Sequence, residues 1–162
     1  MRKQSVLTFC VLTLAILASL PASAAQIAAV PAPIPVPPDL TATGLQILAP
    51  TTLHCGMQTV TFRVNENNGG GSSGPFYLDL QYDYGSGSTF WAICRYSRPG
   101  LGALSTRVLG PINCTFWNGP CDCLPTTYTA TFRVFIDSLN NVAESNEGNN
   151  LSNTVSIPAA CP

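Results

Sequence analysis

Charge is scarce in this sequence, because only 9% of its 162 residues are charged and it contains one histidine. Beyond the first 24 residues there is no lysine, and five arginines against eight acidic residues give a net charge of −3. That balance disfavours nucleic acid and anionic membranes as partners. A single histidine, His54, also leaves no Ser-His-acid set to assemble, and a nucleophilic pair with its neighbour Cys55 would need a free thiolate. The sequence therefore predicts a protein that is not an enzyme.

Long hydrophobic runs are also few, since only one occurs, from Val6 to Leu20. Arg2 and Lys3 precede it and Ala22-Ser23-Ala24 follows, which is the pattern of a signal peptide. The run is shorter than the roughly 20 residues that a bilayer span requires. We expect residues 1–24 to be cleaved, so that the mature chain is secreted, periplasmic or at the cell surface without membrane insertion.

Helical periodicity is missing from the rest of the chain, and strand-like alternation takes its place. Residues 25–38 form a proline-rich, stiff linker. Residues 39–162 follow as one domain, in which Val60, Phe62 and Val64 alternate with polar residues. Seven such segments are expected, at 40–48, 59–65, 76–84, 89–96, 103–109, 128–137 and 150–157. They predict an all-β fold, a seven-stranded antiparallel sandwich of the immunoglobulin or fibronectin-III type.

Strand alternation also assigns side chains to the two faces of each strand. In the third segment it places Phe76, Leu78, Leu80 and Tyr82 inward, with Asp79 and Asp83 on a solvated face. The stretch from Gly110 to Pro125 has no such pattern and is interpreted as an irregular insertion.

Six cysteines remain after the leader with its Cys10 is removed: Cys55, Cys94, Cys114, Cys121, Cys123 and Cys161. An even number in an exported chain favours disulfides over a metal cluster, because the spacing does not fit zinc. Strand direction places Cys55 near Cys161, and we expect that pair. Cys121 and Cys123 are too close to bond each other without strain, so Cys94 and Cys114 are each expected to take one of them.

Three stretches resemble the CARDB family, the cell-adhesion-related domain found in bacteria. They are "PDL" (38–40), "VTFRVNENNGG" (60–70) and above all "FRVFIDSLNNVAESNEGNN" (132–150). The resemblance covers most of residues 38–158 and implies a seven-stranded, non-catalytic module of an exported or surface protein. It also implies binding or adhesion at a bacterial surface or in an extracellular assembly, with a protein or polysaccharide as partner. The family pattern does not include the cysteines of residues 110–125.

The stretch from Asp137 to Asn150 concentrates three acidic residues and five asparagines in fourteen positions. Strand direction places it at the end opposite the cysteines, beside residues 65–74. Carboxylate and amide oxygens are calcium ligands, so a calcium site is one hypothesis. Its candidate ligands are Glu66, Asp137, Glu144 and Glu147, with Asn65, Asn141, Asn146 and Asn149. The alternative, which the sequence favours, is that these asparagines shape a long turn while the glutamates cap backbone amides.

Aromatic residues suggest a second class of function, a carbohydrate-binding module, because exposed rings stack on sugars. Phe116 and Trp117 lie in the irregular insertion and are the candidates, whereas Trp91 alternates with Ile93 and is expected in the core. A secreted protease inhibitor is a third alternative, without support from particular residues.

Overall fold

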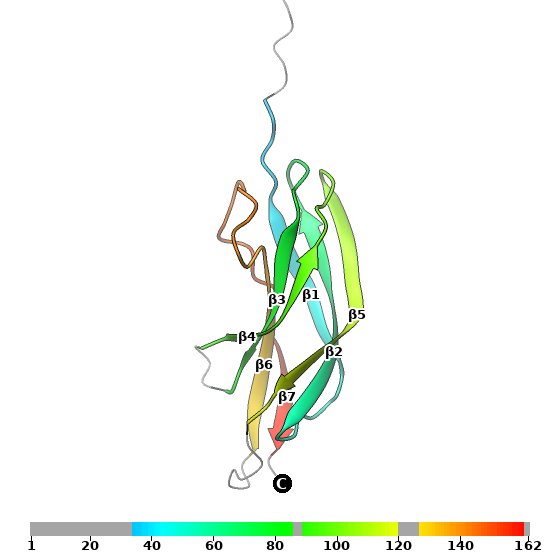
Figure 1. The fold of residues 1–162 in the computed structure, drawn as a ribbon, viewed down its shortest axis with the longest axis vertical. Coiled ribbons are helices and arrows are strands. Elements are labelled where there is room, and N and C mark those ends of the chain that lie inside the picture. The colour runs from blue at the N-terminus through cyan, green and yellow to red at the C-terminus, as the bar shows by residue number, and fades with distance from the viewer. Residues whose placement is uncertain (1–33, 86–88, 120–126, 161–162) are drawn as a thin grey trace, which may run out of the picture. The chain divides into compact units, whose positions relative to one another are not determined.

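The computed structural model describes residues 34–85, 89–119 and 127–160. They form two antiparallel sheets facing each other (Figure 1). One sheet has the order β1-β2-β5, with β1 at Leu40–Ala49, β2 at Met57–Asn68 and β5 at Ser105–Trp117. The other has the order β4-β3-β6-β7, with β3 at Phe76–Asp83, β4 at Trp91–Arg98, β6 at Thr127–Ile136 and β7 at Val155–Ala160. The predicted fold class, seven antiparallel strands in two sheets, is confirmed.

The core lies between the two sheets and is built by the alternation of strand residues. Val60, Phe62 and Val64 of β2 are fully buried, as predicted. From β3, the four inward residues Phe76, Leu78, Leu80 and Tyr82 are buried as well. Tyr82 packs against Phe116 and Phe132, with ring centroids 5.1 and 5.2 Å apart. Hydrophobic burial of these side chains is what holds the two sheets together.

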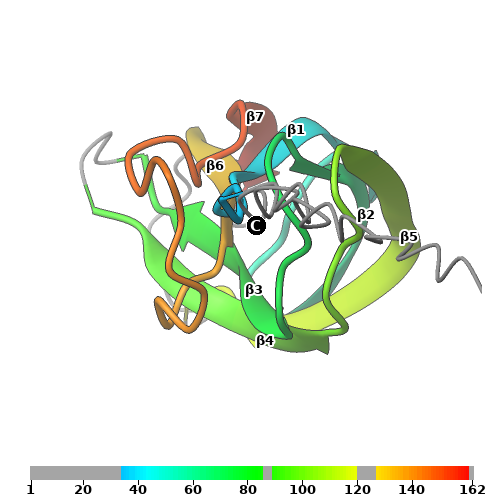
Figure 2. The same ribbon diagram turned by 90° about the horizontal axis from the view of Figure 1, so that it is seen from above.

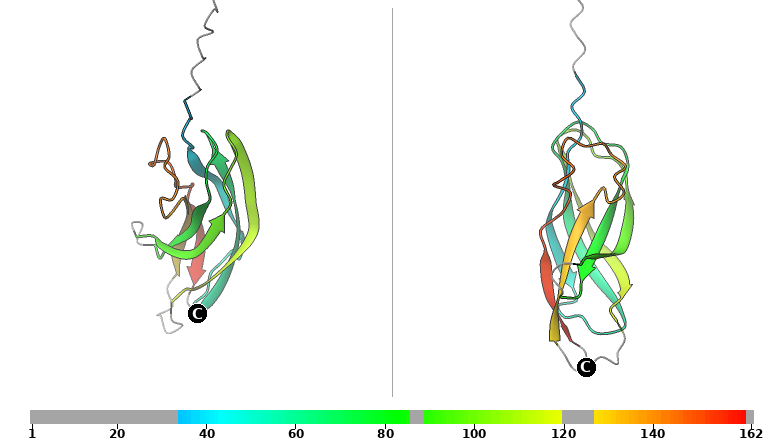
Figure 3. Two further views of the ribbon diagram at one scale, coloured as in Figure 1. Left: turned by 45° about the horizontal axis from the view of Figure 1, so that its top comes forward. Right: turned by 90° about the vertical axis from the view of Figure 1, so that its left-hand side faces the viewer.

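Residues 110–117 belong to a strand, contrary to the irregular insertion expected from Gly110 onward. They continue β5 along β2, from Ile112 opposite Phe62 to Trp117 opposite Met57. A register shift precedes this pairing, and Gly110 has φ +115 at that point. A Cβ on Gly110 would lie 2.5 Å from the carbonyl oxygen of Phe62, so the glycine permits close strand approach. The Gly-Pro sequence thus marks a bulge within β5. Figure 3 shows β5 as one long, curved strand.

Strand direction divides the connecting segments between two ends of the sandwich. The upper end in Figure 1 carries residues 69–75, 99–104 and 137–154, together with the start of β1. The lower end carries residues 50–56 and the end of β7. The acidic stretch is therefore at the end expected from the sequence. No helix long and apolar enough to cross a membrane occurs among the described residues.

A candidate metal centre at the upper end

The loop between β6 and β7 begins with residues in an unusual backbone conformation. Asp137 and Asn140 both have positive φ, at 49° and 51°. The amide of Asn140 donates to the carbonyl oxygen of Asp137 at 2.8 Å, which closes a tight turn. Asp and Asn adopt this left-handed conformation more readily than other non-glycine residues, because their side chains bond the local backbone. Part of the Asn and Asp content of the loop is therefore explained by turn formation.

Two carboxylates of the loop accept hydrogen bonds from backbone amides. The buried carboxylate of Asp137 accepts from Asn141 N at 3.0 Å and from Val142 N at 2.9 Å. Glu147 Oε1 accepts from Glu144 N at 2.9 Å. These bonds shape the loop as the turn-forming interpretation expects, but each carboxylate oxygen has a second lone pair.

Glu144 ties this loop to the first strand of the other sheet. Its Oε2 accepts from Leu40 N, and its Oε1 accepts from Asn150 Nδ2 at 3.1 Å. Burial raises the pKa of Glu144 to about 7; the bond from Leu40 N opposes the rise, and the nearby Glu147 adds to it. A carboxyl with a raised pKa is one whose negative charge lacks sufficient stabilisation.

The three carboxylates converge on one small region. Asp137, Glu144 and Glu147 each offer an oxygen, and these oxygens all lie within 4.8 Å of one another. Two amide oxygens of the same loop, Asn149 Oδ1 and Asn150 Oδ1, are buried with no hydrogen-bond partner in the described chain. Asn150 is only 4% exposed, and the same amide bonds Glu144 through Nδ2. Carboxylate and amide oxygens are ligands of hard cations such as calcium, which takes six to eight oxygens in all. Buried polar atoms left unpaired point the same way, because native proteins seldom leave them so.

Glu66, a candidate ligand under the calcium hypothesis, does not belong to this group. It is fully buried, and its carboxylate receives Arg98 Nε at 2.5 Å and Arg107 Nε at 2.6 Å. The reason is visible in the sequence, because alternation that buries Val60, Phe62 and Val64 also turns Glu66 inward. Two of the five arginines are thereby used to neutralise one interior acid.

The candidate amides also divide between different roles. Asn141 contributes its backbone N–H to Asp137, while its side chain is exposed. Asn146 Oδ1 accepts from Gly148 N at 3.0 Å, which is a local turn contact. Asn65 lies in β2, opposite Thr43 and Val108. Asn149 donates to Asp39 Oδ1. Asn150, which the sequence did not mark as a ligand, is the amide that contacts the carboxylates, through Glu144.

Asp39 and Asn68 are important residues of this end that the sequence reasoning did not single out. Asn149 Nδ2 donates to Asp39 Oδ1 at 2.8 Å, and Ser145 N donates to Pro38 O at 2.9 Å. Asn68 Oδ1 accepts from Asp39 N at 3.0 Å and from Gly70 N at 3.1 Å. The three stretches that resemble the CARDB family therefore meet at this end (Figure 2). The occurrence of Asp39 and Asn68 within these stretches is the sequence feature that could have identified them.

The aromatic candidates are placed differently from expectation. Phe116 is 6% exposed and packs in the core, whereas Trp117 is 56% exposed. Trp91, expected in the core, is 61% exposed. A register shift between β3 and β4 explains this error: Leu80 faces Cys94 and Gln81 faces Ala92, so the alternation breaks at Ile93.

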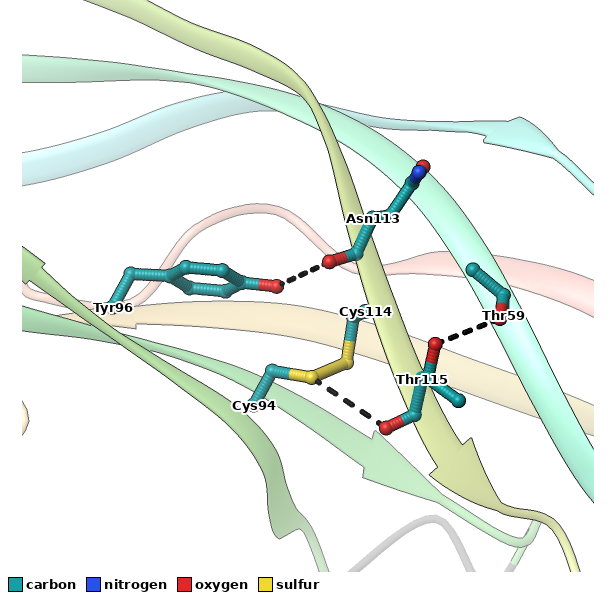
Figure 4. Close-up of a disulfide and its surroundings, with 6 residues drawn as sticks. All are labelled: Thr59, Cys94, Tyr96, Asn113, Cys114 and Thr115. Atoms are coloured by element: carbon teal, nitrogen blue, oxygen red, sulfur yellow. Dashed lines mark hydrogen bonds between the residues drawn. A yellow bond between two sulfur atoms is a disulfide. The ribbon is translucent and has the colours of Figure 1, made fainter.

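The cysteine pairing also requires a correction. Cys94 and Cys114 are bonded to each other, with Cα atoms 5.9 Å apart, and not to Cys121 and Cys123. The bond joins β4 to β5, the edge strands of the two sheets (Figure 4). Cys55 is also disulfide-bonded. Cys121, Cys123 and Cys161 lie outside the described residues, so a Cys55–Cys161 bond stays a prediction.

His54 has no nucleophilic partner in Cys55, because a disulfide-bonded cysteine offers no thiolate. Backbone groups of His54 are used structurally: Asn118 Nδ2 donates to its carbonyl oxygen at 2.6 Å. Asp79 and Asp83, expected on a solvated face, are both buried. Asp79 forms a two-pronged ion pair with Arg95, with both N–O distances 2.8 Å.

No protein-family model and no curated protein matches the chain. Solved structures similar to it include two of the CARDB domain of one Pyrococcus furiosus protein. The crystal structure, in complex with di-metal ions, has 18% identity and a TM-score of 0.49, covering 76% of this chain and 89% of that one. The solution structure has 19% identity and a TM-score of 0.47, covering 77% and 97%. CARDB is the family that residues 38–158 resemble in sequence.

Proposed function

We propose that the chain is a non-catalytic, exported module for binding or adhesion at a bacterial surface, with an upper end that is ordered by calcium. The observation that carries the proposal is the convergence of Asp137, Glu144 and Glu147, with the buried and unpartnered oxygen of Asn150 on an amide that bonds Glu144. The signal-peptide pattern of residues 1–24 supports export. The CARDB-like signature of residues 132–150 supports a binding role.

Calcium suits this site because its oxygens are hard ligands with unused lone pairs. Asp137, Glu144 and Glu147 would hold the ion, with Asn149 and Asn150 as amide ligands. The ion would offset the mutual repulsion of three carboxylates and the cost of burying Glu144. It would also strengthen the contact of the loop with Leu40, since Glu144 bonds that residue's amide. Its role is structural: it orders the end of the sandwich.

A non-catalytic role is supported by what the polar residues of the described chain already do. Asp79 and Glu66 are engaged by arginines. His54 stands next to a bonded cysteine. Turnover in a hydrolase screen that disappears in His54→Ala would overturn this part of the proposal.

The calcium proposal is tested by melting curves of the mature protein in chelator and in millimolar calcium. A ligand that binds only the folded state stabilises it by about 2.7 kcal/mol at a hundredfold excess over Kd. We expect an upward shift of Tm with calcium, lost in Asp137→Asn and Glu144→Gln.

Asp39→Asn is the matched control, because Asp39 is an acid that touches the same loop through Asn149 but is outside the carboxylate cluster. It should keep the calcium shift. If the wild-type melting curves in chelator and in calcium superimpose, the calcium proposal is wrong and the polar residues of the loop only shape its turns. A shift lost equally in Asp39→Asn would indicate diffuse negative charge and contradict a defined site.

A further inference from the structure

The outer face of the β1-β2-β5 sheet carries a patch at its lower end that contains no charged side chain. It is formed by three cross-strand pairs of β2 and β5, Met57–Trp117, Thr59–Thr115 and Thr61–Asn113. Successive odd residues share this face because strand side chains alternate. We call these six residues the neutral patch. Its aromatic end is open to solvent, with Met57 61% and Trp117 56% exposed.

Hydrogen bonds across the strands hold the polar part of the neutral patch in a fixed arrangement. The hydroxyls of Thr59 and Thr115 are 2.8 Å apart, and Thr61 Oγ1 donates to Asn113 Oδ1 at 2.7 Å. Figure 4 shows the Thr115 hydroxyl directed to Thr59 while its carbonyl faces the disulfide. Each hydroxyl keeps unused hydrogen-bonding capacity, and in the described chain the Asn113 amide N–H groups have no acceptor.

Strand β5, which carries half of the neutral patch, is attached to the other sheet through its inner face. The Cys94–Cys114 bond attaches β5 to β4, and Tyr96 Oη donates to the carbonyl oxygen of Asn113 at 3.0 Å. The side chains of Cys114 and Phe116 are buried on the inner face. A binding surface on such a strand needs little ordering when a ligand arrives, which favours affinity.

We propose that the neutral patch binds an uncharged polysaccharide, with the Trp117 indole stacked on a sugar ring and Thr59, Thr115 and Asn113 bonding its hydroxyls. The indole has an apolar face, which matches the apolar C–H face of a sugar ring. The threonine and asparagine side chains beside it offer hydroxyl and amide groups, which match the hydroxyls of the sugar. None of the six positions carries a charge to pair with an anionic polymer. Arg63 follows Thr61 on this face of β2, but it already donates to Gln46 Oε1 at 2.8 Å. This inference rests on the proposed binding role and names its partner class.

The test is retention of the mature protein on insoluble cellulose and on chitin, with alginate beads as the anionic comparison. We expect retention on at least one of the two neutral polymers, unchanged by high salt because no charges are paired. Trp117→Ala should weaken binding about tenfold or more, since it removes the stacking surface. Trp91→Ala is the matched control: Trp91 is equally exposed but lies on β4 of the other sheet, so binding should persist.

Thr115→Val separates the polar contribution, because it keeps the shape of the side chain and removes the hydroxyl. It should weaken binding while melting within a few degrees of the wild type. Failure of both neutral polymers to retain the protein, equal binding by Trp117→Ala, or retention on alginate alone would overturn the inference. Sedimentation that shows a dimer abolished by Trp117→Ala would assign the patch to a second copy instead. None of these outcomes alters the calcium melting experiment or the hydrolase screen, so the proposed function stands or falls separately.

Discussion

Replacing Glu66 by alanine should be among the most destabilising single changes in this protein. The fully buried carboxylate of Glu66 on β2 bonds Arg98 of β4 and Arg107 of β5, and so connects both sheets. The two arginine side chains are themselves partly buried, with exposures of 17% and 30%. Glu66→Ala leaves them without their shared counter-charge in a poorly solvated place.

Breaking a buried ion pair by removing one partner costs about 3–5 kcal/mol. For a domain of this size, that corresponds to a fall in Tm of about 10–20 °C. It is also a large part of the total stability, which is about 5–15 kcal/mol for a typical domain. The loss should change little with salt, because buried pairs are screened less than surface pairs.

The assay is thermal unfolding followed by circular dichroism, in chelator and in calcium. Glu147→Ala, measured in chelator, is the control, because Glu147 is exposed and bonds one backbone amide there. It should lower Tm by a few degrees at most. If Glu66→Ala melts like the wild type in chelator but loses the calcium shift, then Glu66 is a metal ligand and the reasoning from its arginine contacts fails.

Three further predictions concern other parts of the fold. Changing Cys94 and Cys114 together to serine opens a loop of 20 residues and should cost about 3 kcal/mol, measured by urea unfolding; an unchanged midpoint would contradict the pairing. Glu144→Gln should melt no lower than the wild type in chelator above pH 7, since the ionised carboxylate is destabilised there, and should gain nothing from calcium; a retained calcium shift would remove Glu144 from the site. Asn118→Ala removes the amide that accepts from Tyr82 and Tyr128 and should lower stability by about 1–3 kcal/mol; no change in unfolding free energy would show that these hydroxyls find other partners.

The raised pKa of Glu144 sets the sign of the pH dependence. In chelator the raised pKa of about 7 keeps a proton on Glu144 in the folded state, whereas the unfolded carboxyl loses its proton near the ordinary pKa of 4.5. The folded state therefore binds more protons in that window, and its stability contribution falls as pH rises through it. This is why the Glu144→Gln comparison is made above pH 7.

The sequence by itself determined the parts of this protein that depend on local alternation. Alternating apolar residues identified seven strands and the inward faces of β2 and β3. Counting strand directions then placed residues 137–150 at the end where they are found, because consecutive antiparallel strands reverse the chain. The density of Asp, Glu and Asn in that loop was enough to mark three carboxylates that do converge.

The tertiary structure decided whatever depends on residues far apart in the chain or on breaks in alternation. Glu66 is a buried ion-pair partner and not a ligand because Arg98 and Arg107, 32 and 41 residues later, are brought to it by sheet packing. A bulge at Gly110 continues β5, which buries Phe116 and leaves Trp117 exposed, and a second shift at Ile93 exposes Trp91. The packing of the two sheets brings Cys94 of β4 to Cys114 of β5. A shift of one residue turns every later side chain to the opposite face, and composition carries no record of where it occurs.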